Sequence, residues 1–335
     1  MNAKSHKTVV AVVVTALVAL GSIFACQQEN LWDLATLEES HGMFIAAGDN
    51  GVILSSSDGK NWTKSGFADP DNTYYSIATD KKGTWMIVGY NNTYGMGIIF
   101  SSTDSGKSWK NTTSTNTNGN VLRAISTNQS GAWVVASDSG YYAVSSNSGA
   151  SWSDSSFSNS IYGIAHNSNR FVTVGSGFGS FHYSTDAGTS WQTAAATTPS
   201  FSYCAVTINN AFLSIGTDVW ASNDGYTWDY VSSPFGFTRE GAASNTDGRV
   251  IAVGETPEGS FYSDDSGVSW TLVDPSATSN LIGITFGKGI WVTVGADSTT
   301  MIDGVMHYST DNGSSWSFNV APASPVLRCV AYGYR

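Results

Sequence analysis

The stretch Ser102-Thr103-Asp104-Ser105-Gly106-Lys107-Ser108-Trp109 decides the fold, because close copies of it recur along the chain. Four further copies of full length run from Ser145 to Trp152, Ser184 to Trp191, Ser263 to Trp270 and Ser309 to Trp316. Two shorter copies, Ser56 to Trp62 and Ser222 to Trp228, lack one residue before the glycine. We call these seven stretches the box segments.

Each residue type in a box segment suits a tight turn between two strands. The acidic side chain can accept hydrogen bonds from backbone N–H groups of the turn, the glycine can adopt positive φ, and the tryptophan can fold back onto the hairpin. We therefore expect a structural role for Asp58, Trp62, Asp104, Trp109, Asn147, Trp152, Asp186, Trp191, Asp224, Trp228, Asp265, Trp270, Asp311 and Trp316.

The spacing of the box segments predicts the architecture. Their tryptophans lie 37 to 47 residues apart, which is the length of one four-stranded propeller blade. Each interval holds a strand with a core aliphatic pair, such as residues 75–78, and then a short apolar run ending in glycine, such as residues 85–89. Short unbroken apolar runs are typical of strands buried on both faces. The sequence predicts an all-β, seven-bladed β-propeller of four-stranded antiparallel blades, one domain over residues 41–335.

Two stretches compete for the innermost strand of the first blade, residues 31–35 and residues 327–331. Propellers commonly close by pairing strands from the two chain ends, which removes exposed sheet edges. We expect the C-terminal stretch to complete the first blade. Residues 27–40 would then form a tether or an additional edge strand.

The box segments resemble the Asp-box, also called the bacterial neuraminidase repeat, Ser-x-Asp-x-Gly-x-x-Trp. The pattern of the whole mature chain also resembles the photosystem II assembly factors and related exported proteins, which are seven-bladed Asp-box propellers. That resemblance implies a scaffold that docks partner polypeptides. The Arg-rich surface patch associated with the assembly factors is missing here, which puts a photosynthetic role in doubt.

A ligand is expected on the face opposite the box segments. Aligning the repeats on the core aliphatic places seven residues at one equivalent position, at the beginning of each innermost strand: Tyr75, Arg123, Tyr162, Tyr203, Glu240, Ile282 and Arg328. We call these seven residues the ring, and we predict all of them except Ile282 to be ligand-binding. Tyrosine and arginine combine apolar faces with directional donors, which suits peptides or sugars. The alternative is that they cap the channel and pair with one another, Arg123 or Arg328 with Glu240.

Sialidase activity is the first enzymatic function to weigh, because sialidases share the repeat. That family uses an arginine triad, which Arg123, Arg239 and Arg328 could supply, and a tyrosine activated by a glutamate, here Glu240. However, its Phe/Tyr-Arg-Ile-Pro signature is absent, its propellers have six blades, and a shared fold does not carry chemistry. We predict a non-catalytic protein, with a sialidase-like glycoside hydrolase as the less favoured alternative.

Metal, cofactor and disulfide signals are weak. The five histidines show no metal-ligand spacing, and no phosphate-binding loop is present, so we predict no cofactor and no metal. Cys204 and Cys329 each follow a ring residue in blades that are not neighbours. That separation is too large for a disulfide, and we expect both to be small buried hydrophobes.

The N-terminus has the form of an export signal. Lys4 and Lys7 precede an apolar run over residues 9–20, which has the length of a signal-peptide core and is short for a membrane span. Residues 23–26, Ile-Phe-Ala-Cys, resemble a bacterial lipobox. We predict a lipoprotein-type signal peptide over residues 1–26 with lipidation at Cys26. The alternative is an ordinary signal peptide with an incidental cysteine.

The net charge of the chain and its predicted export limit the classes of partner that it can bind. The formal net charge is −11 and the basic residues are scattered without a stripe, which argues against nucleic acid. An acidic, exported chain fits the bacterial cell envelope, at the outer membrane, in the periplasm or on the cell surface. We expect a protein or peptide partner, with a glycan as the alternative, and membrane contact only through a lipid anchor.

Overall fold

The computed structural model describes residues 42–113, 116–177, 179–195, 201–236, 239–255, 259–274, 279–319 and 324–334. The chain divides into two units, Met1–Gly42 and Met43–Arg335. The predicted signal peptide, Cys26 and the predicted tether over residues 27–40 lie outside the described residues. Within those residues, no helix is long and apolar enough to cross a membrane.

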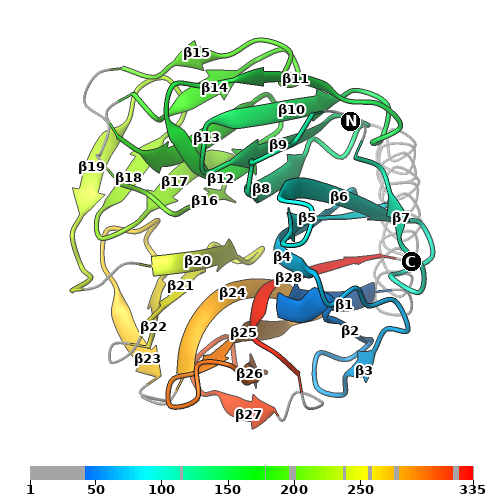
Figure 1. Cartoon of the computed structure of the whole chain (residues 1–335). Helices are drawn as coiled ribbons and strands as arrows, with labels where there is room; N and C mark the ends of the chain where they lie inside the picture. Colours follow the sequence, from blue (N-terminus) through cyan, green and yellow to red (C-terminus); the bar gives the residue numbers. More distant parts are fainter. Residues whose placement is uncertain are drawn as a thin grey trace, which may run out of the picture. The chain divides into compact units, whose positions relative to one another are not determined.

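Seven four-stranded antiparallel sheets surround a common centre as propeller blades (Figure 1), which confirms the predicted fold. Blade 1 has the order β28 (Leu327–Tyr334), β1 (Gly42–Gly48), β2 (Ile53–Ser56) and β3 (Thr63–Lys64). Blade 2 comprises β4 (Asn72–Thr79), β5 (Trp85–Asn91), β6 (Met96–Ser102) and β7 (Lys110–Asn111). Blade 3 comprises β8 (Leu122–Thr127), β9 (Trp133–Ser137), β10 (Tyr141–Ser145) and β11 (Ser153–Ser156).

The other four blades repeat this plan. Blade 4 comprises β12 (Ser160–His166), β13 (Phe171–Ser176), β14 (His182–Ser184) and β15 (Gln192–Thr193). Blade 5 comprises β16 (Cys204–Ile208), β17 (Ala211–Ile215), β18 (Val219–Ser222) and β19 (Asp229–Ser232). Blade 6 comprises β20 (Arg239–Ser244), β21 (Val250–Gly254), β22 (Ser260–Ser263) and β23 (Thr271–Asp274). Blade 7 comprises β24 (Ser279–Gly287), β25 (Ile290–Asp297), β26 (Gly304–Ser309) and β27 (Ser317–Asn319).

The C-terminal strand closes the propeller, as predicted. β28 is the innermost strand of blade 1 and lies beside β1, from the other end of the described chain. A short 3-10 turn, η1 (Asp49–Gly51), links β1 to β2. The competing stretch, residues 31–35, lies outside the described residues.

The core lies between the blades. The apolar runs predicted from the sequence are second strands, and residues such as Trp85, Trp133, Phe171 and Trp291, at the start of these strands, are fully buried. The buried apolar side chains form clusters that each join two neighbouring blades, for example Trp85 and Trp109 of blade 2 with Ile45 of blade 1. Removing one such large side chain costs about 3–5 kcal/mol, because a cavity remains where its neighbours cannot collapse.

Each box segment forms the turn between the third and fourth strands of its blade. In the copy that ends at Trp109, the Asp104 carboxylate accepts hydrogen bonds from the Ser108 backbone N–H at 2.9 Å and from the Ser102 hydroxyl at 2.8 Å. The indole N–H of Trp109 donates to the Gly106 carbonyl at 3.1 Å. The same indole-to-glycine bond recurs at Trp62, Trp191, Trp228 and Trp270.

The acidic side chains of the box segments are held in their charged form. Hydrogen bonds from the side chain and backbone of Ser108 lower the pKa of Asp104 to about 2, and those from Ser315 lower the pKa of Asp311 to about 2. Asn147 stands where the other copies have aspartate, and it accepts the equivalent bond from the Ser151 N–H at 3.0 Å. The turn therefore needs an acceptor oxygen there, not a charge.

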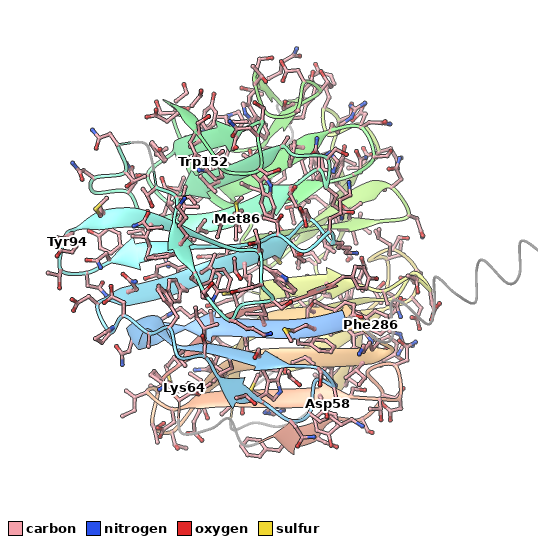
Figure 2. All side chains as sticks on the ribbon, turned by 90° about the vertical axis from the view of Figure 1, so that its right-hand side faces the viewer. Asp58, Lys64, Met86, Tyr94, Trp152 and Phe286 are labelled. Atoms are coloured by element: carbon pink, nitrogen blue, oxygen red, sulfur yellow. The ribbon has the colours of Figure 1, made fainter. Side chains whose placement is uncertain are left out.

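The box segments lie on one face of the propeller and join successive blades there. Figure 2 shows Asp58, in a box segment, and Phe286, near the end of an innermost strand, on the side away from Tyr94, which follows a second strand. A methyl group added at Gly149 of blade 3 would lie 2.3 Å from Met86 of blade 2. The Arg170 side chain of blade 4 donates to the Asp224 carbonyl of blade 5. These contacts account for the box segments as structural elements.

Candidate functional site: the ring cavity

The seven ring residues line one cavity of about 350 Å³ at the centre of the propeller. A deeper cavity of about 260 Å³ is lined by the same residues and by the two residues that follow each of them on the innermost strands. The ring therefore bounds both spaces. The structure brings together every residue that the sequence placed at this position, while their role in binding stays a prediction.

Five of the seven ring side chains sit at β-bulges in the described strands. The pairing of first and second strands shifts register between Tyr74 and Ser76, Leu122 and Ala124, Ile161 and Gly163, Arg239 and Gly241, and Leu281 and Gly283. The extra residue in each shift is a ring residue, and a bulge re-aims the side chain that it carries. The expectation that ring residues begin their strands was wrong in this detail, since β4 starts three residues before Tyr75.

A glycine at the end of each of several second strands makes room for the bulge. A methyl group on Gly175 would lie 1.8 Å from the Ser160 carbonyl oxygen, two residues before Tyr162. Gly89 and Gly295 face the equivalent carbonyls of their own blades, where a methyl group would lie 2.0 Å away in both cases. The glycines that end the apolar runs in the sequence are therefore needed where the second strand passes close to the backbone of the first strand, just before the ring residue.

One arc of the ring consists of a tyrosine between two arginines. The guanidinium carbons of Arg123 and Arg328 lie 4.1 Å and 5.4 Å from the centre of the Tyr75 ring. Arg123 Nε donates to Asp138 Oδ2 at 3.0 Å. Arg328 donates to Asp49 through Nε and, at 3.0 Å, through Nη2.

The alternative pairing of Arg123 or Arg328 with Glu240 is wrong. Asp138 directly follows β9, the neighbour of the strand that carries Arg123. Asp49 directly follows β1, the neighbour of the strand that carries Arg328. Each arginine therefore pairs with an aspartate of its own blade. Glu240 lies in blade 6, across the channel from Arg123. An aspartate just after the second strand was present in the sequence as a signal, and it occurs in both blades whose ring residue is arginine.

A second arc is aromatic. The rings of Tyr162 and Tyr203 are stacked with centroids 5.1 Å apart and planes at 17°. Phe201 stacks on Tyr203 at 6.2 Å and is 52% exposed. Burial raises the pKa of the Tyr203 hydroxyl, and the charges of Tyr162 and Glu240 add to the shift. This arc offers a continuous aromatic surface from the rim to the cavity.

Glu240 and Ile282 complete the ring. Burial raises the pKa of the Glu240 carboxyl and the nearby Glu255 raises it further, while Arg328 and Arg123 act in the opposite direction. In the part of the chain that the structure describes, Glu240 has no hydrogen-bond or ion-pair partner. It is therefore a half-buried carboxylate without a hydrogen-bond or ion-pair partner among the described residues.

Arg239 does not join the ring, so the three arginines that the sialidase alternative would require do not converge. Glu240 lines the cavity, whereas the preceding residue, Arg239, does not. Arg239 is fully buried, its guanidinium lies 4.9 Å from the ring centres of Phe235 and Phe261, and it donates to the Gly259 carbonyl at 2.8 Å. It packs where blades 5 and 6 meet.

The cysteines and possible metal ligands add no chemistry to the cavity. Cys204 and Cys329 carry free thiols, as expected, and both line the deeper cavity. Burial raises the pKa of each thiol to about 12, so both are inert at neutral pH. Among the described residues, no three histidine, cysteine, aspartate or glutamate side chains gather as metal ligands.

Comparison with known proteins rests on structure. No protein-family model and no curated protein sequence matches this chain. A solved structure described as YCF48 bound to D1 peptide matches with 15% identity and a TM-score of 0.58, over 75% of this chain and 83% of that one. YCF48 from Cyanidioschyzon merolae matches with 19% identity and a TM-score of 0.57, over 76% and 89%.

An enzyme is also among the similar structures. A catalytically inactive virginiamycin B lyase from Staphylococcus aureus, solved with quinupristin, matches with 12% identity and a TM-score of 0.61, over 75% of this chain and 85% of that chain. At identities of 12–19%, the similarity to YCF48 and to the lyase shows that this chain shares their propeller fold, and nothing further.

Proposed function

We propose that this chain is an exported, non-catalytic Asp-box propeller that binds a protein or peptide partner at the ring cavity. The observation that carries the proposal is the convergence of seven side chains of four types on one cavity, at positions that are structurally equivalent in the seven blades. Repeats that serve only the fold keep the same residue types, as the box segments do. The ring instead presents tyrosine, arginine, glutamate and isoleucine.

The chemistry of the cavity suits a polypeptide segment. Stacked phenol rings and guanidinium planes bury apolar surface while their polar atoms fix orientation. A volume of about 350 Å³ is at the lower end of the range for ligand pockets, which fits one or two side chains entering from a partner. The D1 peptide seen with the similar YCF48 propeller supports this kind of ligand.

The absence of an assembled arginine triad supports a non-catalytic role. Arg239 packs between two phenylalanines instead of lining the cavity with Arg123 and Arg328. A sialidase-like site would need three arginines around one carboxylate. The direct check is a fluorogenic sialoside assay, in which turnover by the chain and its loss in Glu240→Gln would overturn the proposal.

A pull-down from the cell envelope tests binding at the ring. We expect the purified chain to recover a protein partner, and the variants Tyr162→Ala and Tyr203→Ala to recover at least about tenfold less, equivalent to about 1.4 kcal/mol. Tyr226→Ala is the matched control, because Tyr226 is a half-exposed tyrosine in a box segment on the other face. Equal recovery by wild type and both ring variants would remove the cavity from the proposal.

A glycan is the second candidate, favoured by the stacked surface of Tyr162, Tyr203 and Phe201. Flat aromatic faces can stack on the apolar faces of sugar rings. A glycan array separates the two candidates. Glycan binding that Tyr203→Ala abolishes, with no protein recovered from the envelope, would favour the sugar.

Export and anchoring form a separate part of the proposal. They rest on the basic start, the apolar run and Cys26, all in the sequence before residue 27. Cys26→Ala is expected to abolish metabolic labelling with a fatty acid and to release the protein from the membrane fraction. Unchanged labelling would show that Cys26 is not the lipidated residue.

A further inference from the structure

The charge of the cavity is unevenly distributed. Arg123 is paired with Asp138 and Arg328 with Asp49, so the arc around Tyr75 carries no net charge. Paired guanidinium groups attract a further anion far less than free ones, because the aspartate cancels their field at short range. The two arginines therefore do not make the cavity a site for anions.

Glu240 supplies the excess charge. It lies in the cavity wall without a direct partner among the described residues, and Glu255 adds negative charge nearby. The four carboxylates of Glu240, Glu255, Asp138 and Asp49 thus outnumber the two arginines in and near the ring. A half-buried charge without a partner loses part of its hydration, and a bound cation would offset that cost.

The neighbours of Glu240 in the ring suit the stem of a long cationic side chain. Tyr203 lies on one side in blade 5 and Ile282 on the other in blade 7. Tyrosine faces attract cations through the ring quadrupole, and an aliphatic stem packs on isoleucine. Lysine and arginine combine such a stem with a charged head.

We propose that the ring cavity takes a lysine or arginine side chain of the partner polypeptide, with its charge against Glu240 and its stem along Tyr203 and Ile282. This inference rests on the proposed function, since it presumes a peptide at the ring. It adds the chemical identity of the anchoring residue. It also predicts that partner selection follows positive charge, although the ring contains two arginines.

Short random peptides displayed on phage test the inference without knowledge of the natural partner. The purified full-length chain is panned, and peptides that also bind the Tyr162→Ala, Tyr203→Ala double variant are discarded. The remaining peptides are expected to share a lysine or arginine at one position. Replacing a shared lysine by norleucine, which keeps the stem and removes the charge, should weaken binding about tenfold.

A double-mutant cycle then assigns the charge to Glu240. Glu240→Gln should weaken the lysine peptide by a similar factor and leave the norleucine peptide unaffected, because the coupled charge is already gone. Asp154→Asn is the matched control, since it removes one negative charge from an exposed outer strand. It should change the binding of neither peptide.

The outcomes distinguish this inference from the proposed function. Peptides that share an acidic residue and lose affinity in Arg123→Ala would overturn the cationic anchor while supporting peptide binding at the ring. A shared lysine that is insensitive to Glu240→Gln would overturn the assignment to Glu240. If all selected peptides also bind the double variant, the proposed function and this inference both fail.

Discussion

The two faces of the propeller use the same sevenfold plan in opposite ways. On one face, each box segment places nearly the same residues in nearly the same turn, and the Asp or Asn side chain accepts hydrogen bonds within that turn, as in the bonds from Ser102 and Ser108 to Asp104. On the other face, seven equivalent positions, five of them at β-bulges in the described strands, carry side chains of four types that all line one cavity. In this chain, repetition identifies the parts that build the fold, and divergence at an equivalent position identifies the part available for binding.

The carboxylates of the two faces show the same contrast. Hydrogen bonds from Ser108 lower the pKa of Asp104, whereas burial and Glu255 raise the pKa of Glu240. The charged form is stabilised by the fold in the first case and opposed by it in the second. A carboxylate that is unfavourable in the free protein, as that of Glu240 is, points to a functional role such as binding a cationic ligand.

The largest effect is expected from removing a box tryptophan. Trp228 is 2% exposed, packs on Phe181 and donates to the Gly225 carbonyl, so Trp228→Ala should lower the free energy of unfolding by about 3–5 kcal/mol. Replacing the half-buried ring residue Tyr162 by alanine should lower the free energy of unfolding by only about 1 kcal/mol. Urea unfolding measures both, and equal losses would contradict the division between the faces.

A smaller loss should follow when the bulge is disturbed. Gly175→Ala places a methyl group against the Ser160 carbonyl, which should cost about 1–3 kcal/mol and displace Tyr162. Ligand binding at the ring should fall even at temperatures where the variant remains folded. Gly66→Ala is the control, because nothing lies within 4 Å of an added methyl group there; a Gly175→Ala variant with normal stability and binding would show that the glycine is dispensable.

The loss of folding stability at acidic pH tests the role of the aspartates in the box segments. The folded-state pKa of Asp104, about 2, lies below its usual value of 3.8, so its contribution is complete above the usual value and is lost as pH falls toward 2. Asp104→Asn, which copies the natural Asn147, should keep the fold and lose stability less steeply between pH 5 and about 2. Urea midpoints across that range measure the slope, and an unchanged slope would contradict the assignment.

The smallest effect is expected at the ring carboxylate. Because the pKa of Glu240 is raised, its charged form opposes folding, and stability tied to its protonated form declines as pH rises through the folded-state pKa. Glu240→Gln should therefore leave the free energy of unfolding at pH 7 unchanged or slightly higher. A clear loss of stability would mean that Glu240 has a structural partner.

The sequence was sufficient for the parts that repeat. Tryptophans from Trp62 to Trp316 count the blades, and alignment on the core aliphatic brings residues from Tyr75 to Arg328 to one level of the channel. Both results follow from register within a repeated unit. Seven repeats that agree with one another make the alignment of each single repeat more secure.

The interactions between unlike residues were not predictable in the same way. The pairing of Arg123 with Asp138, the stacking of Tyr162 on Tyr203 and the burial of Arg239 each depend on one blade or one pair of blades. The apolar pattern does not predict the bulges, because a shift of one residue changes which face a side chain occupies and leaves a strand that is apolar on both faces looking the same. Their signal, the glycine that ends the second strand, was visible in the sequence, but its reason was not.

Hydrogen–deuterium exchange of the full chain, alone and with the partner recovered from the envelope, tests the central claim most directly. The account predicts that exchange slows in the innermost strands near Tyr162, Tyr203 and Glu240, and in the loops that follow the second strands. Exchange in the box segments should be unchanged. Slower exchange in the box segments, with the ring strands unaffected, would contradict the assignment of binding to the ring cavity.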